Sequence, residues 1–555
     1  MHRISGRTRV LSLVLAATLA GFGATGVGQP AHASPATSAT HLRPTMTHAQ
    51  ASDALSRAEL LFHGTRAQSR MVQRHEDATM VLRDLRLAYP GLTTSERAQV
   101  DRLLARPSTG NPDTTNDISY AGPEAPPDCD ANICVHYVKQ ADDTNNGVAD
   151  TDTDHNSIPD YVDEVLATVE HVRSTYAAAG YRTPLDDSAS ADNGGDRKTD
   201  IYLAELGNKG FYGYCTSDDP NLASNVFYAS AYCVLDNNFT DGVFSNHTPL
   251  QNLQVTTAHE FFHAVQFAYD IGEDQWIMEA TATWAEDQLY TTINDNMQYL
   301  RFGPNPITAP GMPLDTNGDV NLHWYGTWIF FRFLTERLVT TSSGGLPLLM
   351  LQIWRKLDSH PGSPDMYSIL GVKSALASHG IDLTSALSRF DLAARHPTTY
   401  FHEAAANHYP SAPIATSSAI GPGHLKWSSS FRLLHLSYRV LRLTPKAGTG
   451  KAWHLKVHLD LPPTSHGGAA TLWINKKSGG TSAKLISLSS TGDATFRIAF
   501  NAATVKNVEL EVINASPRFT GCFPSVLSNT YYSCYAAHGA DDKLADNVQA
   551  TAYKA

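Results

Sequence analysis

Hydrophobic residues recur with different patterns in three parts of the chain. From Thr47 to about Arg106 they return at the spacing of amphipathic helices. Pro90-Gly91 interrupts this pattern, and the residues Thr93–Glu96 that follow have the sequence of a helix-capping box. We therefore predict a helical N-terminal region over residues 34–108 and a Pro- and Gly-rich linker over residues 109–127.

The central part of the chain mixes short strand-like runs with longer helical ones. The runs Asp200–Ala204 and Tyr228–Leu235 are rich in β-branched and aromatic residues, which favours strands, and Phe211–Tyr214 has a similar composition. Residues 346–406 return to helical spacing. This mixture predicts an α+β domain over residues 128–428.

From about Ser429 onward, apolar and polar residues alternate in short runs that are separated by Gly and Ser. Alternation is typical of strands with one buried face, so we predict a β-sandwich over residues 429–555. The runs are Phe431–Leu436, Trp453–Leu459, Ala470–Ile474, Ala494–Ile498, Val508–Ile513 and Val548–Ala552.

The first residues have the pattern of a secretion signal. A basic start ends at Arg9, an apolar run extends from Val10 to about Ala24, and Ala31–Ala33 has the small-residue pattern of a cleavage site. The apolar run is too short to span a bilayer comfortably, and no later run is long and charge-free enough to do so. We therefore expect residues 1–33 to be a signal peptide and the mature protein to be secreted and extracellular, without a membrane span.

The six cysteines fall into three pairs of near neighbours. An even number of cysteines in an exported chain predicts disulfides, and pairing between neighbours is the simplest of the possible connectivities. These neighbours are Cys129 with Cys134, Cys215 with Cys233, and Cys522 with Cys534.

The net charge of −12 argues against nucleic acid as a partner, and much of the acidity lies in an Asp- and Asn-rich loop over residues 142–163. Oxygen-bearing side chains recur there at the spacing of an EF-hand-like calcium loop, although Ser157 stands where Gly is usual. The alternative is a solvated acidic turn that caps the helix beginning near Pro159. The candidate calcium ligands are Asp152, Asp154, Asn156, Asp160 and Asp163.

The segment His259–His263 spells H-E-x-x-H within an apolar stretch of helical character. His259 and His263 lie one helical turn apart on the same face, so both imidazoles can reach one metal ion. Glu260 then lies beside the metal, where it can take a proton from a water molecule. In the alternative interpretation, these are a capping or core histidine and a surface carboxylate. The apolar surroundings favour the metal site, because a charged group on a buried helix needs a partner.

A second predicted helix supplies a third metal ligand. Glu279 lies near the start of the segment Trp276–Asp287, and two His with a downstream Glu form the ligand set of a catalytic zinc site. Glu286, two turns farther along the same face, is an alternative ligand or an acceptor for a ligand histidine. Farther along the chain, His323 and Tyr325 are candidates for stabilising an oxyanion. The alternative is that their side chains pack in the core.

The stretch Ala258–Asp270, followed by Trp276–Asp287, resembles an uncharacterised family of secreted bacterial metalloproteases. The pattern around Glu279 is similar to the third-ligand helix of gluzincin peptidases, although the gap after His263 is a few residues shorter. The resemblance implies a zincin-like catalytic domain that hydrolyses peptide bonds of a protein or peptide substrate with one Zn2+. In zincins an edge strand binds the substrate backbone, and we expect Ala231–Leu235 to be that strand.

Several alternatives remain open at this point. The helical N-terminal region is either a pro-segment or a subdomain that packs on the catalytic domain. The protein could instead be a secreted binding or adhesion protein that retains a zincin scaffold, or a zinc hydrolase of a non-peptide bond. The sequence does not determine the oligomeric state.

Overall fold

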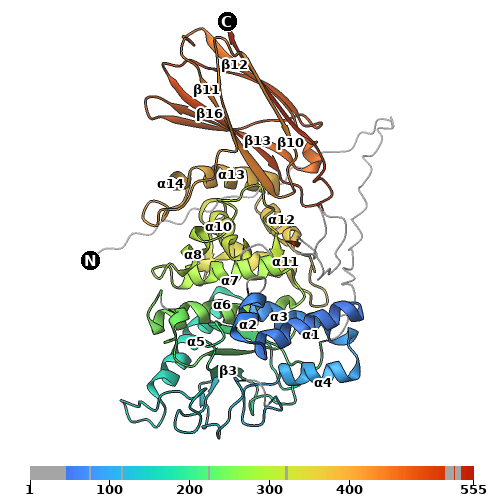
Figure 1. Ribbon diagram of the computed structural model, residues 1–555, viewed down its shortest axis with the longest axis vertical. Coiled ribbons are helices and arrows are strands. Elements are labelled where there is room, and N and C mark those ends of the chain that lie inside the picture. Colours follow the sequence, from blue (N-terminus) through green and yellow to red (C-terminus); the bar gives the residue numbers. More distant parts are fainter. Residues whose placement is uncertain are drawn as a thin grey trace, which may run out of the picture. The chain divides into compact units, whose positions relative to one another are not determined.

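The computed structural model describes residues 46–73, 77–113, 117–222, 226–244, 246–318, 323–518, 530–531 and 539–555. The fold mixes helices with several small sheets, which confirms the predicted α+β class (Figure 1). The predicted signal peptide and the pair Cys522 and Cys534 lie outside the described residues.

The N-terminal region consists of four helices that share a core with the first sheet. Helices α1 and α4 begin with capping boxes at Thr47 and Thr93, and α4 therefore begins where the sequence predicted a helix. Leu61 and Leu85 of the helices are buried in one cluster with Tyr202 of the sheet. The four helices are α1 (His48–Phe62), α2 (Arg66–Gln73), α3 (Ala78–Ala88) and α4 (Thr94–Leu103).

The first sheet has the strand order β1-β2-β3-β5-β4. Adjacent residues of β3 enter different cores, since Tyr202 packs with the N-terminal helices and Leu203 packs on the opposite side of the strand. The sheet thus lies between the N-terminal helices and the helices that carry the candidate site. The strands are β1 (Asp128–Cys129), β2 (Ile133–His136), β3 (Thr199–Ala204), β4 (Gly213–Thr216) and β5 (Tyr232–Asp236).

The run Ala231–Leu235 forms most of strand β5, as predicted, but the prediction that it is the edge of the sheet is wrong. Strand β5 pairs with β3 on one side and with β4 on the other, so β4 forms the edge of the sheet. Strand β4 has the residues Gly-Tyr-Cys-Thr, whose β-branched content is too low to mark it clearly in the sequence. Its position depends on antiparallel pairing with β5, which local composition does not determine.

The second core contains the long helices of the central domain. Helix α6 begins with a capping box at Thr248 and is buried along most of its length, and α7 follows after a short turn. The helices of this part are α5 (Asp160–Ala179), α6 (Pro249–Asp270), α7 (Gln275–Leu289), α8 (Gln298–Arg301), α9 (His323–Gly326), α10 (Trp328–Phe333), α11 (Leu348–Leu357), α12 (Ile369–Ala377), α13 (Leu383–Arg395) and α14 (Pro397–Tyr400). Among the helices that the structure describes, none is long and apolar enough to cross a membrane.

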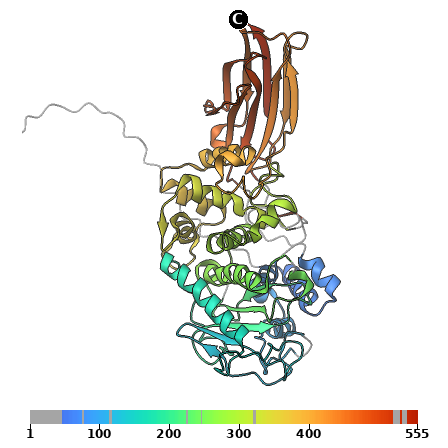
Figure 2. The ribbon, with the colours of Figure 1, turned by 90° about the vertical axis from the view of Figure 1, so that its left-hand side faces the viewer.

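The C-terminal part consists of two sheets around one apolar core, seen as two layers in Figure 2. Its first strand begins at Thr416, upstream of the predicted boundary at residue 429. One sheet contains β10 (Lys426–Phe431), β18 (Asp546–Lys554), β12 (Trp453–Asp460) and β15 (Asp493–Ala499). The other contains β14 (Thr481–Leu485), β13 (Gly468–Lys476), β16 (Val505–Asn514), β11 (Ser437–Pro445) and β9 (Thr416–Ile420).

The predicted strand Phe431–Leu436 is also wrong, because β10 ends where this run begins and β11 starts after it. The run forms a loop around His435, whose ring nitrogens lie 3.0 Å from an oxygen of Asp315 and 2.9 Å from an oxygen of Asp542. Leu433 and Leu436 are buried in this anchored loop although it does not belong to a sheet.

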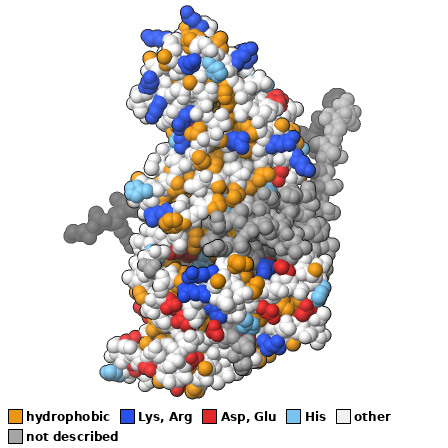
Figure 3. All heavy atoms as spheres, in the orientation of Figure 1, with side chains coloured by type: hydrophobic (Ala, Val, Ile, Leu, Met, Phe, Trp, Pro, Cys, Tyr) orange, Lys and Arg blue, Asp and Glu red, His pale blue; other side chains and the backbone are white. Residues whose placement is uncertain are grey.

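The surface charge differs between the C-terminal sandwich and the rest of the molecule. On the face drawn in Figure 3, Lys and Arg predominate over the sandwich, whereas Asp and Glu lie mostly in the lower part of the molecule, where Lys and Arg are present as well. The net charge of −12 is that of the whole chain, and it differs in sign from the charge on this face of the sandwich. The argument that net negative charge disfavours nucleic acid as a partner therefore applies to the remainder of the chain.

Two of the three predicted disulfides are confirmed. Cys129–Cys134 joins β1 to β2, and Cys215–Cys233 joins the edge strand β4 to β5. The second bond therefore fixes the edge strand on its neighbour, next to the helix that carries the H-E-x-x-H segment.

Arg106 connects the end of the N-terminal region to the central domain. Its side chain is fully buried and contacts the carboxylates of Asp187, Asp200 and Asp218. Buried ion pairs tolerate the loss of one partner poorly, because the remaining charge stays in a region of low polarity.

We predict that Arg106→Met lowers the free energy of unfolding by about 3–5 kcal/mol, because three carboxylates then lose their common partner. Urea unfolding of the wild type and the variant measures this difference. Arg102→Met, at an exposed position of α4, is the matched control and should change the free energy by less than about 0.5 kcal/mol. Equal effects of the two substitutions would contradict a structural role for Arg106.

Candidate metal centre

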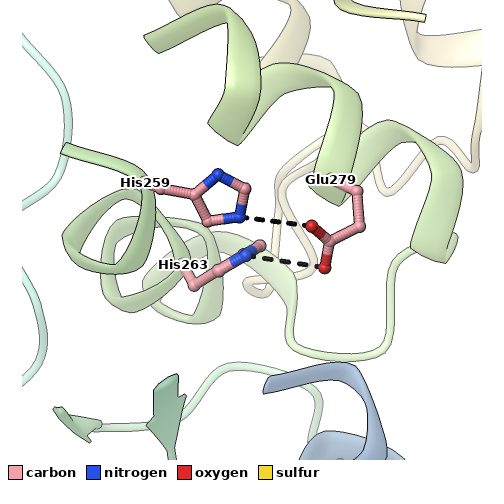
Figure 4. Close-up of side chains that lie close together, drawn as sticks. All are labelled: His259, His263 and Glu279. Carbon is pink, nitrogen blue, oxygen red and sulfur yellow. Dashed lines mark hydrogen bonds and ion pairs between the residues drawn. The ribbon is translucent and has the colours of Figure 1, made fainter. Parts of the chain in front are cut away.

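Helices α6 and α7 bring two histidines and a glutamate together (Figure 4). His259 and His263 lie one turn apart on α6, with their ring centroids 4.8 Å apart. Glu279 faces them from the start of α7, with Oε2 3.2 Å from Nε2 of His259 and Oε1 3.6 Å from Nε2 of His263. All three side chains are buried, so the predicted ligand set is assembled at one point.

Each histidine is oriented by a second partner on its other ring nitrogen. Nδ1 of His259 lies 2.6 Å from Oε1 of Glu286, and Nδ1 of His263 lies 2.7 Å from Oε1 of Gln266. Both Nε2 atoms therefore point toward Glu279. Glu286 is where the sequence analysis expected an acceptor for a ligand histidine. Gln266 was missed, although its distance of three residues from His263 places it one turn along the same helix.

The side chains at this point fit a divalent metal ion. Among the described residues, Nε2 of His263 and Oε1 of Glu279 are buried without a hydrogen-bond partner. Buried polar atoms are rarely left in this state, and an ion between them would satisfy both. Two imidazole nitrogens and one carboxylate form the donor set of a catalytic zinc site.

Burial also disfavours the ionised carboxyl groups of the site. It raises the pKa of Glu286 to about 7, and together with the nearby Asp77 carboxylate it raises the pKa of Glu279 to about 7. Burial and Asp77 likewise raise the pKa of Glu260 well above its ordinary value. A bound cation would act in the opposite direction, since it stabilises the ionised form of each carboxyl group.

Glu260 faces a cavity of about 250 Å³ beside the candidate ligands. The cavity is also lined by His259, by Tyr325, and by Tyr212 and Gly213 at the beginning of the edge strand β4. A carboxylate, a candidate ligand and an edge strand thus border the same space.

The two candidate oxyanion donors occupy different positions. Tyr325 lines the cavity, with its ring centroid 5.8 Å from that of His259. Burial and the neighbouring Asp77 raise the pKa of Tyr325 well above its ordinary value, so its hydroxyl stays protonated and can donate. His323 is fully buried, contacts Thr327, and is not among the described residues that line the cavity. The structure therefore brings only Tyr325 of this pair to the cavity.

The first turn of α3 also reaches the site, which the sequence analysis did not anticipate. The hydroxyl of Thr79 donates to Oε2 of Glu260 at 2.9 Å, and the hydroxyl of Tyr325 donates to Oδ2 of Asp77 at 2.9 Å. Asp77 precedes a helix as an N-cap, which is a common role for Asp and gave no functional signal in the sequence.

The Asp-rich loop brings three of its five predicted calcium ligands together. Asp152, Asp154 and Asp160 offer oxygen atoms within 4.8 Å of one another. The other two adjoin this cluster, since the side-chain amide of Asn156 donates to Oδ2 of Asp154 at 3.3 Å and to Oδ2 of Asp163 at 3.1 Å. Ser157 has a φ of 77°, the left-handed conformation for which Gly is usual at this position of a calcium loop.

Comparisons with known proteins give no functional information. No protein-family model matches the chain, and a search of the curated proteins found no match. The chain is similar to a mutant of PliG-Ec, a periplasmic inhibitor of g-type lysozyme from Escherichia coli, with 13% identity and a TM-score of 0.13 over 25% of this chain and 96% of that one. It is also similar to the GH115 4-O-methyl-α-glucuronidase BtGH115A, with 9% identity and a TM-score of 0.14 over 68% of this chain and 54% of that one. At these TM-scores neither likeness carries an argument.

We predict that Glu286→Gln weakens zinc binding by about tenfold, because changing the outer partner of a ligand histidine typically costs 10–100-fold in metal affinity. The substitution keeps the shape of the side chain and an acceptor for His259, but it removes the charge. Competition with a chelator measures the dissociation constant, and circular dichroism verifies the fold. Unchanged zinc affinity in folded Glu286→Gln protein would contradict this role.

Proposed function

We propose that the protein is a secreted, zinc-dependent peptidase of the gluzincin type. The observation that carries the proposal is the convergence of His259, His263 and Glu279 on one point, with buried ring and carboxylate atoms that lack other partners among the described residues. Glu260 lies next to this point and faces the cavity.

The three ligand side chains would hold Zn2+, which supplies a Lewis acid and lowers the pKa of a water molecule. Glu286 and Gln266 keep the two imidazoles in the orientation that this task needs. Helices α6 and α7 are buried along most of their length, and the cavity beside His259 is the route by which water would reach the ligands.

Glu260 is the proposed general base. It takes a proton from the attacking water and later passes it to the leaving amine. The protonated hydroxyl of Tyr325 lines the same cavity and is the proposed donor to the oxyanion that forms when water adds to the peptide carbonyl.

The edge strand β4 is the proposed binding site for the substrate backbone. Gly213 lines the cavity beside Glu260, and a Cβ atom at this position would lie 3.1 Å from Cγ of Glu260. A residue without a side chain therefore suits the close approach of strand and helix. An extended peptide could add to this edge by main-chain hydrogen bonds.

Secretion and calcium binding are further parts of the proposal. Two disulfides are expected of a protein from an oxidising compartment, which supports export. The clustered oxygens of Asp152, Asp154 and Asp160 support a Ca2+ ion that stabilises the loop before α5.

We predict that Glu260→Gln lowers the rate of cleavage of denatured casein by at least about 100-fold, which is the lower range for the loss of a general base. Zinc content should remain about one ion per chain in both proteins, because Glu260 is not one of the three proposed ligands.

The matched control is Glu170→Gln, which removes a carboxylate from a surface ion pair with Arg173 and should leave the rate unchanged. Zinc in both proteins with equal rates would exclude Glu260 as the base. Zinc in both with no cleavage of any peptide would instead favour a binding protein that retains the scaffold.

A further inference from the structure

The first turn of α3 is held inside the candidate site by its own capping interaction. Oδ1 of Asp77 accepts a hydrogen bond from the backbone amide of Thr79 at 2.7 Å, which is the usual geometry of an N-cap. The side chain of Thr79 is fully buried. The start of helix α3 therefore fixes the positions of the Asp77 and Thr79 side chains.

This turn contacts the proposed base and the proposed oxyanion donor together. The hydroxyl of Thr79 donates to Glu260, at the carboxylate that would take a proton from water. Asp77 accepts the hydroxyl proton of Tyr325, which would otherwise be directed to the oxyanion. While these hydrogen bonds persist, the single hydroxyl proton of Tyr325 is not available to an oxyanion, and one of the two carboxylate oxygens of Glu260 is occupied.

The same turn also occupies the edge at which a substrate would bind. The backbone amide of Cys215, in the edge strand β4, donates to the hydroxyl of Thr79 at 2.9 Å. This amide therefore points away from β5, and by the alternation of strand hydrogen bonds the backbone groups of Gly213 point the same way. A peptide that pairs with this edge has to displace Thr79.

Asp77 also lies close to His263, which is one of the three candidate ligands. A carboxylate oxygen of Asp77, one of Glu260 and a ring nitrogen of His263 all lie within 4.8 Å of one another. Each carboxylate oxygen of Asp77 accepts one hydrogen bond, and a carboxylate oxygen retains a further lone pair for an ion. Catalytic zinc sites keep one position open for water, whereas four protein ligands close the site.

We propose that Asp77 is a fourth ligand to the metal and that the first turn of α3 holds the site closed. The inference rests on the proposed function for the identity of the site, and it adds a latent state to it. Release of this one turn would free the metal position, the base, the oxyanion donor and the edge strand together.

The remainder of α3 is anchored independently of its first turn. The guanidinium of Arg83 donates to the carbonyl of Ile271 at 2.8 Å, and the side-chain amide of Gln275 donates to Asp84 at 3.0 Å. The N-terminal helices also share a core with the sheet. These contacts favour a local movement of the first turn over removal of the whole helical region as a pro-segment.

The test compares the wild-type chain with Asp77→Ser. Serine still caps the helix, since Ser and Asp are equally good N-caps, but its side chain is too short to reach the metal. Asp382→Ser is the matched control, because Asp382 caps α13 by accepting from the amide of Ser385 and lies outside the site. Asp77→Asn, which keeps the shape and the cap without the charge, serves as a second variant.

Two readouts report on the metal directly. The loss of Asp77 should weaken zinc binding by roughly 10–100-fold in competition with a chelator, at least as much as the loss of an outer partner. The visible absorption spectrum of the cobalt-substituted protein should change in both Asp77 variants and not in Asp382→Ser. Casein cleavage by Asp77→Ser should rise by about tenfold, because the contacts of Asp77 with Tyr325 and the metal are lost and the turn is then held closed only by Thr79.

Unchanged zinc affinity and an unchanged cobalt spectrum in both Asp77 variants would overturn the inference. Slower cleavage with unchanged coordination would also overturn it and would make Asp77 a positioning residue for Tyr325. A changed spectrum without cleavage by any variant would support Asp77 as a ligand and count against the peptidase. A wild-type chain that binds no zinc would remove the proposed function and this inference together.

Discussion

The central physical constraint is the burial of ionisable groups on two adjoining helices. His259, His263 and Glu279 are 7%, 0% and 0% exposed, and Glu260 and Glu286 beside them are also buried. An unpaired buried charge costs several kcal/mol, and the carboxyl groups here outnumber the imidazoles that could balance them. A divalent cation would offset this imbalance, because it would bind the unpartnered nitrogen and oxygen atoms and favour the ionised carboxylates.

The neighbouring elements are arranged around this constraint. Strand β4 is fixed to β5 by a disulfide and lies against α6, so the edge of the sheet is close to Glu260. The N-terminal helices cover the other face of the sheet and insert one turn beside the same carboxylate. The same arrangement that positions the proposed catalytic groups therefore also provides a way to block them, and both depend on where α3 begins.

The parts of the site that the sequence predicted are those set by local geometry. His259, His263 and Glu286 follow from helical periodicity, and Gln266 could have been found in the same way. Asp77 and Thr79 could not, because the contact between Thr79 and Glu260 joins residues 181 positions apart in the chain. The edge strand was misassigned for a related reason: which strand lies outermost depends on pairing between distant segments, whereas composition reports only strand propensity.

The central claim is that His259, His263 and Glu279 hold one zinc ion. It is tested most directly by X-ray diffraction from crystals of the zinc-loaded protein, with data on both sides of the zinc absorption edge. The account predicts one strong anomalous peak at about 2.0–2.2 Å from Nε2 of both histidines and from an oxygen of Glu279. A fully loaded protein whose anomalous peaks all lie elsewhere would contradict it.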